Sequence, residues 1–147
     1  KSATYYQSGF FNHVDEKIAE EVADYATKNT FPGSQVQFGH QAGKMSTMAR
    51  DATAFPHRDT VFQFTTDVHW ADRRDGPANR KFADDTWAAI RPMGSGGFYV
   101  NLAVDPSEAD VREAYAENYD RLVEVKDKYD PDNFMRLNVN IKPSGAM

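Results

Sequence analysis

The residues that most suggest chemistry are Tyr99 and Asn101, a phenol and a carboxamide two positions apart in the segment Gly96–Leu102. On a β-strand, residues two apart project from one face with about 6.6 Å between their α-carbons. Side by side they could line a polar pocket or simply lie on a half-exposed sheet face, and the spacing leaves both interpretations open. A free tyrosine is almost entirely protonated at neutral pH. Tyr99 could therefore act as a base only if a cation or another donor stabilised its phenolate, and would otherwise orient a substrate by hydrogen bonding.

A second polar cluster, Ala54–Asp59, contains His57 and Arg58 directly before a strand-like segment. These two side chains could lie at the rim of a pocket, and either of them could supply the cation that Tyr99 would need. The cluster could equally be a salt-bridged turn. We take His57 and Arg58 as candidate substrate-pocket residues.

The segment Thr60–Trp70 has the alternation that is typical of a long β-strand. One face carries Phe62, Phe64, Thr66, Val68 and Trp70, and the other carries Gln63, Thr65, Asp67 and His69. The polar face should meet either a ligand or solvent. Gln63 and His69 are therefore further candidate substrate-pocket residues.

Composition limits the chemistry that the chain can perform. It has 147 residues, of which 40% are hydrophobic, enough for one domain with a real core. It has no cysteine, which excludes disulfides, thiolate metal sites and cysteine-linked cofactors within it. Its four histidines are not at close ligand spacing, so we expect no metal site.

Charge and hydropathy limit the partners. The net charge is −5, and residues 105–132 hold ten acidic and four basic side chains. Nucleic acid is not an expected partner, because phosphate binding needs a clustered basic patch. No apolar run approaches the length of about 18 residues that a membrane span needs. We expect a soluble chain without a membrane partner, and either a cytoplasmic or a secreted location is open.

The remaining patterns predict the elements that must position these residues. Apolar residues alternate in strands and recur at three- and four-residue spacing in helices. We expect strands at 1–7, 35–41, 60–70 and 98–104, a possible brief strand at 44–49, helices at 14–28, 79–91 and from 107 onward, and a turn at 130–133. Asn118 marks a break, so the last helical region is either one bent helix or two short ones. The order of elements predicts an α+β fold, an antiparallel sheet with helices packed on one face.

Four sequence blocks resemble one known family in the right order. They are DATAFPHRD (Asp51–Asp59), Trp70 at the end of the next strand, GGFYVN (Gly96–Asn101) and NYDRLVEVKDKYDPDNFMRLNVNI (Asn118–Ile141). Together they resemble the C-terminal half of berberine-bridge-enzyme-like, FAD-linked oxidoreductases. KSATYY (Lys1–Tyr6) is similar to the entry strand of their substrate domain. The C-terminal block is specific, whereas the first forty residues match only in pattern.

The resemblance implies a fold, a cofactor and site residues. These enzymes resemble vanillyl-alcohol-oxidase-type flavoproteins, in which an antiparallel substrate domain covers a flavin held by an FAD-binding domain. Residues 1–104 would be substrate-domain sheet and helices, and residues 105–147 a helical segment and tail that return to the FAD domain, whose counterpart is absent from this chain. The implied catalytic residue is Tyr99, and the implied cofactor contacts are Asn101, Asn138 and Asn140. The family usually has Gln where this chain has Val139.

The expected function follows from that resemblance. The chain would be the substrate-binding C-terminal portion of an FAD-dependent oxidase that oxidises a hydroxylated small molecule, such as a sugar or a secondary metabolite, with hydride transfer to the flavin. Its partners would be the FAD-binding domain of the parent protein and the small-molecule substrate. The alternative is a stand-alone α+β binding or assembly module without redox activity.

Overall fold

The fold is given by a computed structural model that describes residues 3–28 and 32–145. The first two residues of the expected strand 1–7 lie outside these ranges. The elements are β1 (Ala3–Phe11), α1 (Glu16–Lys28), β2 (Gln35–His40), β3 (Phe62–Trp70), α2 (Gly76–Ile90), α3 (Glu108–Tyr115) and α4 (Tyr119–Tyr129). Short 3-10 turns occur at Met45–Thr47, Arg73–Asp75, Arg91–Met93, Val100–Leu102 and Ala116–Asn118.

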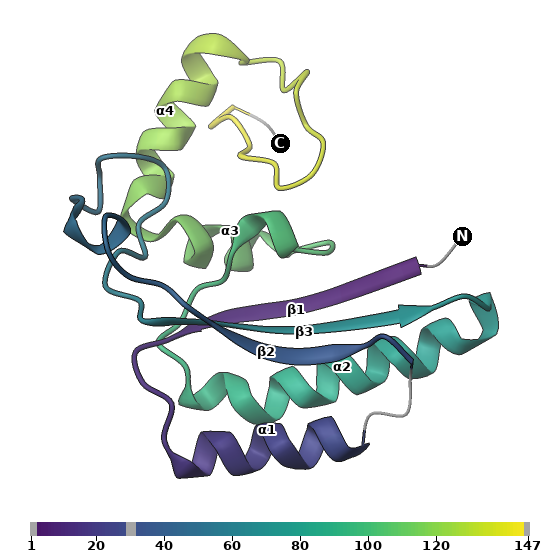
Figure 1. Cartoon of the computed structure of the whole chain (residues 1–147). Coiled ribbons are helices and arrows are strands. Elements are labelled where there is room, and N and C mark those ends of the chain that lie inside the picture. The colour runs from purple at the N-terminus through teal and green to yellow at the C-terminus, as the bar shows by residue number, and fades with distance from the viewer. Residues whose placement is uncertain (1–2, 29–31, 146–147) are drawn as a thin grey trace.

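The strands form an antiparallel sheet in the order β1-β3-β2, so β3 is the central strand. The register places Gly9 and Phe38 on either side of Phe64, on the apolar face of the sheet. Helices α1 and α2 cover this face (Figure 1) and contribute to its buried core of Phe11, Ile18, Phe64 and Ile90. The expected antiparallel α+β fold is confirmed, with α1 and α2 packed on one face of the sheet.

A close contact fixes how α2 lies on the sheet. The ring of Trp87 stacks on that of Phe64, with centroids 5.8 Å apart and planes inclined by 15°. A Cβ atom at Gly9 would lie 2.0 Å from the Trp87 ring. Glycine at this strand position therefore lets the indole of α2 rest directly on the backbone of β1.

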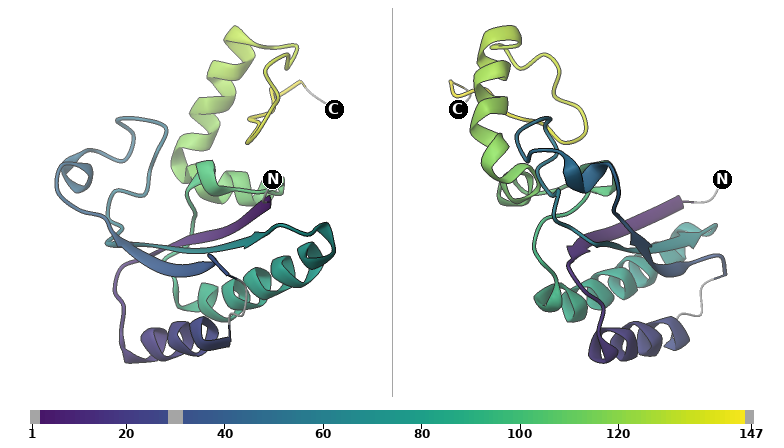
Figure 2. Two further views of the ribbon diagram at one scale, coloured as in Figure 1. Left: turned by 45° about the vertical axis from the view of Figure 1, so that its right-hand side comes forward. Right: turned by 60° about the vertical axis from the view of Figure 1, so that its left-hand side comes forward.

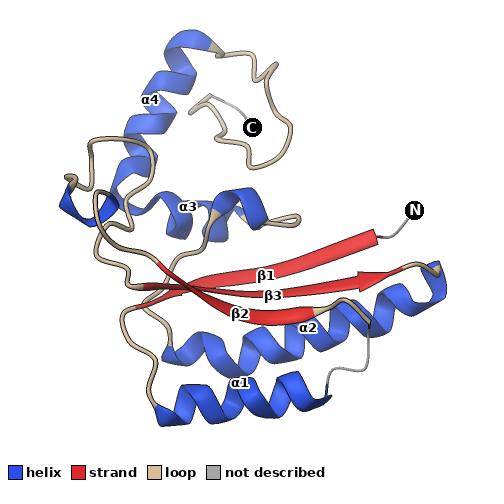
Figure 3. Cartoon of the chain, in the orientation of Figure 1, coloured by secondary structure: helices blue, strands red, loops and turns tan. Residues whose placement is uncertain are grey.

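The opposite face of the sheet is polar and lies toward the C-terminal half of the chain. The connection between β2 and β3, together with α3 and α4, lies on this side, away from α1 and α2 (Figures 1 and 2). Figure 3 shows that the connection is mostly loop, as is the tail after α4. Thr65 and Asp67, in the middle of β3, are buried on this polar face. The polar face is therefore not uniformly open to solvent.

The predicted strand at 98–104 is wrong. Val100–Leu102 is instead a 3-10 turn. The preceding Gly96 and Gly97 have positive φ, and the Gly97 N–H donates to the Glu113 carboxylate at 2.8 Å rather than to a strand. Five alternating residues are compatible with a strand, but a strand also needs to pair along a sheet, and the turn at Gly96 and Gly97 directs this segment to Glu113 instead.

Other boundaries differ in smaller ways. The possible strand at 44–49 is a 3-10 turn, and β1 extends four residues beyond the predicted 1–7. Helix α2 begins at Gly76 rather than at residue 79, since Pro77 suits a first helical turn.

The C-terminal helical region resolves into two helices. Ser107 and Asp110 form the predicted capping box at the start of α3. Ala116 has a φ of 43°, and the 3-10 turn at Ala116–Asn118 separates α3 from α4. The alternative of two short helices is therefore correct. The predicted turn follows α4, with the Asp130 carboxylate accepting from the backbone N–H of Phe134 at 2.8 Å.

Candidate functional site

A cavity of about 560 Å³ brings together three of the predicted site residues, namely Arg58, Gln63 and Tyr99. We call it the Tyr99 cavity. Its remaining walls come from the β2–β3 connection, the 3-10 turn after Gly97 and helix α3, and are Gln41, Met45, Ala54, Phe55, Phe98, Val100, Ala114 and Tyr115. Segments far apart in sequence thus meet at one end of β3.

Tyr99 and Asn101 lie side by side, as predicted, although not on a strand. The Asn101 Nδ2 donates to the Tyr99 hydroxyl oxygen at 2.7 Å. Tyr99 is 36% exposed. Because Asn101 supplies a donor to the phenol oxygen, the phenol O–H remains available to donate to an oxygen of a bound molecule. This pair can therefore orient a hydroxyl or carbonyl group at the mouth of the cavity.

Arg58 is the charged member of the cavity wall and is only 7% exposed. Its Nη2 donates to the Thr53 hydroxyl, and its guanidinium carbon lies 5.2 Å from the centre of the Phe55 ring. Its backbone N–H donates to the Pro56 carbonyl at 2.7 Å, which tightens the turn. Arg58 thus lies in a turn and also in the wall of the Tyr99 cavity, but the salt bridge of this turn joins Asp59 to Arg50 and not to Arg58. Its role as a substrate-pocket residue stays a prediction.

His57 points elsewhere. Its Nε2 is 3.0 Å from the carbonyl oxygen of Ala114, and its ring packs 4.9 Å from that of Phe10. A Cβ atom at Gly97 would lie 2.2 Å from the ring. Burial lowers the pKa of His57, which favours the neutral ring. His57 lines a separate recess with Gly97, and the structure does not bring it to the wall of the Tyr99 cavity.

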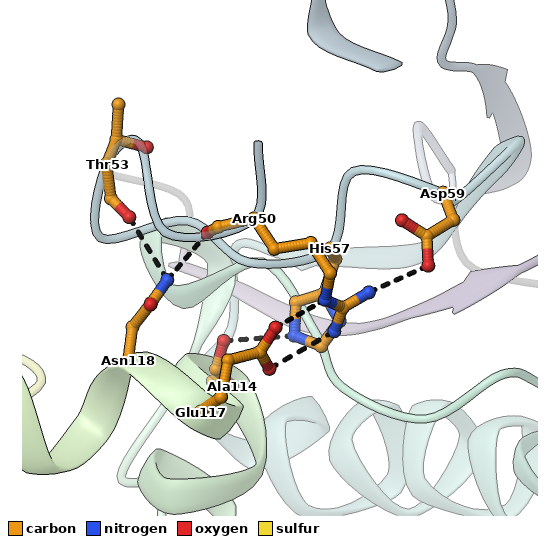
Figure 4. A network of polar contacts seen from close by, with 7 residues as sticks. All are labelled: Arg50, Thr53, His57, Asp59, Ala114, Glu117 and Asn118. Atoms are coloured by element: carbon orange, nitrogen blue, oxygen red, sulfur yellow. Dashed lines mark hydrogen bonds and ion pairs between the residues drawn. The ribbon is translucent and has the colours of Figure 1, made fainter. Parts of the chain in front are cut away.

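A polar network holds the β2–β3 connection against the C-terminal helices (Figure 4). Arg50 donates to Asp59 at 2.7 Å and to both carboxylate oxygens of Glu117. The Asn118 Nδ2 donates to the carbonyl oxygens of Arg50 and Thr53, at 2.8 and 3.1 Å. The hydrogen bond from Arg50 lowers the pKa of Glu117 to about 2. We call these contacts the Arg50 clamp.

The sequence analysis missed the Arg50 clamp. Arg50 and Glu117 are separated by 67 residues, so no spacing rule connects them. The one usable signal was Asn118, which marked a break between helices. The buried amide of Asn118 donates hydrogen bonds to the backbone of the connection that carries Arg58, and these bonds help to position the cavity wall.

His69 lies at the far end of β3 from the Tyr99 cavity. Gln63 and His69 are six residues apart on one strand, or about 20 Å. The His69 Nε2 lies 2.6 Å from a carboxylate oxygen of Asp67, and its Nδ1 lies 3.1 Å from the Thr4 hydroxyl. The Gln35 Nε2 donates to the other carboxylate oxygen of Asp67 at 2.9 Å. The structure therefore places His69 in a separate polar cluster.

The three predicted cofactor contacts fall in two places. Asn101 and Asn138 line a shared hollow of about 700 Å³ beside Val139. Asn140 lines a different, smaller hollow against α4, where its buried Oδ1 has no hydrogen-bond partner among the described residues. Amide side chains can donate and accept at once, which suits the alternating donors and acceptors along the edge of a flavin ring.

Two absences can be stated for residues 3–28 and 32–145. No three His, Asp or Glu side chains are grouped so that they could hold a metal ion. No helix in these ranges has the length and apolar character needed to cross a membrane.

Comparison with known proteins gives the relationship of the chain. Residues 98–142 match the family model described as "Berberine and berberine like". Berberine bridge enzyme-like 17 of Arabidopsis thaliana is 32% identical over 134 residues, which cover 80% of this chain and 25% of that protein. The uncharacterized FAD-linked oxidoreductase YvdP of Bacillus subtilis (strain 168) is 31% identical over 107 residues, covering 73% of this chain and 24% of that protein.

A solved structure agrees with these matches. BBE-like #28 from Arabidopsis thaliana superposes with a TM-score of 0.84 at 20% identity, covering 97% of this chain and 34% of that one. The chain is similar to the C-terminal part of the berberine-bridge-enzyme-like FAD-linked oxidoreductases. The resemblance to this family that the sequence predicted is thereby confirmed, as is the expected fold class. The chain spans about a quarter of the length of the two curated relatives.

Proposed function

We propose that this chain is the substrate-side portion of an FAD-dependent oxidoreductase that oxidises a hydroxylated small molecule. The observation that carries the proposal is the Tyr99–Asn101 pair beside a cavity with Arg58 and Gln63 in its wall, in a chain similar to FAD-linked oxidoreductases. The pair offers a phenol O–H to a substrate oxygen at the mouth of a largely apolar cavity.

In this proposal each residue has a defined task. Tyr99 is the catalytic residue, which either receives the proton of the substrate hydroxyl or holds that hydroxyl by a hydrogen bond. Asn101 orients the Tyr99 hydroxyl through the 2.7 Å contact. Gln63 and Arg58 bind polar groups of the substrate. The flavin, when bound, supplies the hydride acceptor. His57 and His69 support the fold and the polar sheet face rather than the cavity wall.

The flavin would contact the chain at its amide-lined hollow. Asn101 and Asn138 share that hollow with Asp105, and Asn140 lies further along the same tail. The remaining contacts to FAD would come from an FAD-binding domain of the parent protein. The asparagines fit the edge of a flavin, because amides offer donors and acceptors without charge.

The tail is proposed to pack on that FAD-binding domain. Phe134, Met135 and Leu137 are 85%, 77% and 87% exposed, although they are large and apolar. Several large apolar side chains exposed within four residues indicate an interaction surface. Residues 1–104 would then form the substrate-domain part, and residues 105–147 the segment that returns to the flavin side.

The test uses Tyr99→Phe in the full-length protein that contains this chain. Anaerobic reduction of the flavin by substrate should slow by about 10²–10⁴-fold while flavin absorbance is retained. Tyr25→Phe, on α1 across the sheet, is the matched control and should leave the rate unchanged. Equal reduction rates in the wild type and Tyr99→Phe would remove Tyr99 from catalysis. A full-length protein that is colourless and refuses added FAD would instead support the binding-module alternative.

A further inference from the structure

Arg58 is a buried cation that the protein does not neutralise. It is only 7% exposed, yet none of the carboxylates in the described part of the chain forms an ion pair with it. Its Nη2 donates to the Thr53 hydroxyl, whereas its buried Nε has no partner among the described residues. A buried charge without a counter-ion is costly, and the contact with the Phe55 ring offsets only part of that cost.

The carboxylates of Asp59, in this connection, and of Glu117, in the turn before α4, pair with a neighbouring arginine instead. Arg50 belongs to the same β2–β3 connection, is more exposed, and binds two carboxylates, Asp59 and Glu117. Asp59 follows Arg58 directly in the sequence but is directed to Arg50. The exposed Arg50 thus has two carboxylate partners, whereas Arg58, in the cavity wall, has none and its Nε has no hydrogen-bond partner among the described residues.

The other walls of the Tyr99 cavity describe the rest of the ligand. None of the lining residues is acidic, although the chain as a whole carries a net charge of −5. Most of the wall is apolar or aromatic, from Met45, Phe55, Phe98, Val100 and Tyr115. Such a wall favours an aromatic or other apolar body over a molecule covered in hydroxyl groups.

Gln41 adds a neutral polar side chain to the same wall. Its Nε2 donates to Gln63 at 2.5 Å, and its Oε1 is buried without a hydrogen-bond donor among the described residues. The two glutamines carry no charge, so Arg58 supplies the charge of the cavity wall.

We propose that the Tyr99 cavity binds a hydroxy acid, whose carboxylate pairs with Arg58 and whose apolar body lies against the aromatic wall. The guanidinium fork matches a carboxylate with two parallel hydrogen bonds. This inference rests on the proposed function and narrows its substrate class, placing the hydroxyl-bearing carbon toward Tyr99.

The test compares two probes on this chain by ¹H–¹⁵N NMR titration. They are 3-(4-hydroxyphenyl)propionate and its primary amide, which have the same body and differ in charge. The acid should bind about 10- to 100-fold more tightly than the amide, as expected of a charge-assisted hydrogen bond, with shifts at the backbone amides of Gln63 and Tyr99. Equal binding of the two probes to the wild type would overturn the proposal without any variant.

Three variants sharpen the result. Arg58→Gln should abolish the preference for the acid, and Arg58→Lys should keep only part of it, because lysine lacks the fork. Arg121→Gln, on the exposed side of α4, removes the same charge and should keep the full preference. A preference for the acid that survives Arg58→Gln in a folded protein would contradict the proposal.

The assay also separates this inference from the proposed function. It requires no flavin, so its failure leaves the Tyr99→Phe reduction test intact. The flavin itself could supply the negative group that pairs with Arg58. In that case, acid and amide would bind this chain equally, and Arg58→Gln in the full-length protein would lower the affinity of its flavin for sulfite. That combined result would assign Arg58 to the cofactor and overturn the proposal.

Discussion

Gly97 is the position where a single methyl group should cost the most. Its φ is +72°, and a Cβ atom there would lie 2.2 Å from the Cε1 atom of His57. The left-handed backbone costs an L-residue about 1–2 kcal/mol. Overpacking against a ring that is held on both sides adds about 1–3 kcal/mol. Gly97→Ala should therefore lower the free energy of unfolding by about 2–5 kcal/mol.

Its neighbour provides the matched control. Gly96 also has a positive φ, of +82°, but the nearest atom to its added Cβ is Glu113 Oε1 at an ordinary 3.5 Å. Gly96→Ala should therefore show the backbone cost of about 1–2 kcal/mol alone. Urea denaturation followed by circular dichroism measures both variants, and the difference between them isolates the clash with His57.

A double-mutant cycle decides whether that clash is the cause. In a His57→Ala background the extra cost of Gly97→Ala over Gly96→Ala should disappear, because the ring is gone. A Gly97→Ala variant that is no less stable than Gly96→Ala would refute the clash with His57. A difference between them that persists without the imidazole would refute it as well.

Two further predictions concern the stability of the protein at acidic pH and the packing of α2 on the sheet. The pKa of Glu117 is lowered to about 2 by Arg50, so its stabilising contribution is present above pH 4.5 and is lost as pH falls toward 2; both side chains are exposed, so the loss should stay under about 1 kcal/mol. Urea denaturation measured at several pH values between 5 and 2.5 should show that the free energy of unfolding falls less steeply with decreasing pH in Glu117→Gln than in the wild type. An unchanged pH dependence would contradict the assignment to Glu117. Gly9→Ala should cost about 1–3 kcal/mol because of the Trp87 ring, and Trp87→Leu should relieve the added cost; no relief would rule out that ring as the cause.

The long periodic elements could be predicted because their pattern reports burial directly. The helix predicted at 14–28 is found at Glu16–Lys28, and the strand predicted at 60–70 at Phe62–Trp70. In both, many residues repeat one period, so a single exception does not change the assignment. The segment 98–104 offered only five alternating residues. Its actual conformation depends on Glu113, which no local pattern contains.

The candidate site was predictable to the extent that its residues are close in sequence. Tyr99 and Asn101 lie together in a turn as they would on a strand, because two residues can hardly separate far. Arg58 and His57 are adjacent, yet they line different hollows. The directions of the two side chains depend on packing against residues far away in the sequence, such as the contact of His57 with Phe10. The spacing of residues along the chain does not predict such contacts.

The Arg50 clamp has a consequence for which part of the molecule opens most easily. It holds the β2–β3 connection through ion pairs between exposed side chains, which contribute little to stability. Strand β3, by contrast, pairs with β1 and β2 and places Phe64 in the buried core. The cavity wall that carries Arg58 is therefore expected to be less stable than the sheet. Hydrogen exchange should accordingly find the connection opening at lower free energy than β3, as a unit that can let a ligand in while the sheet stays folded.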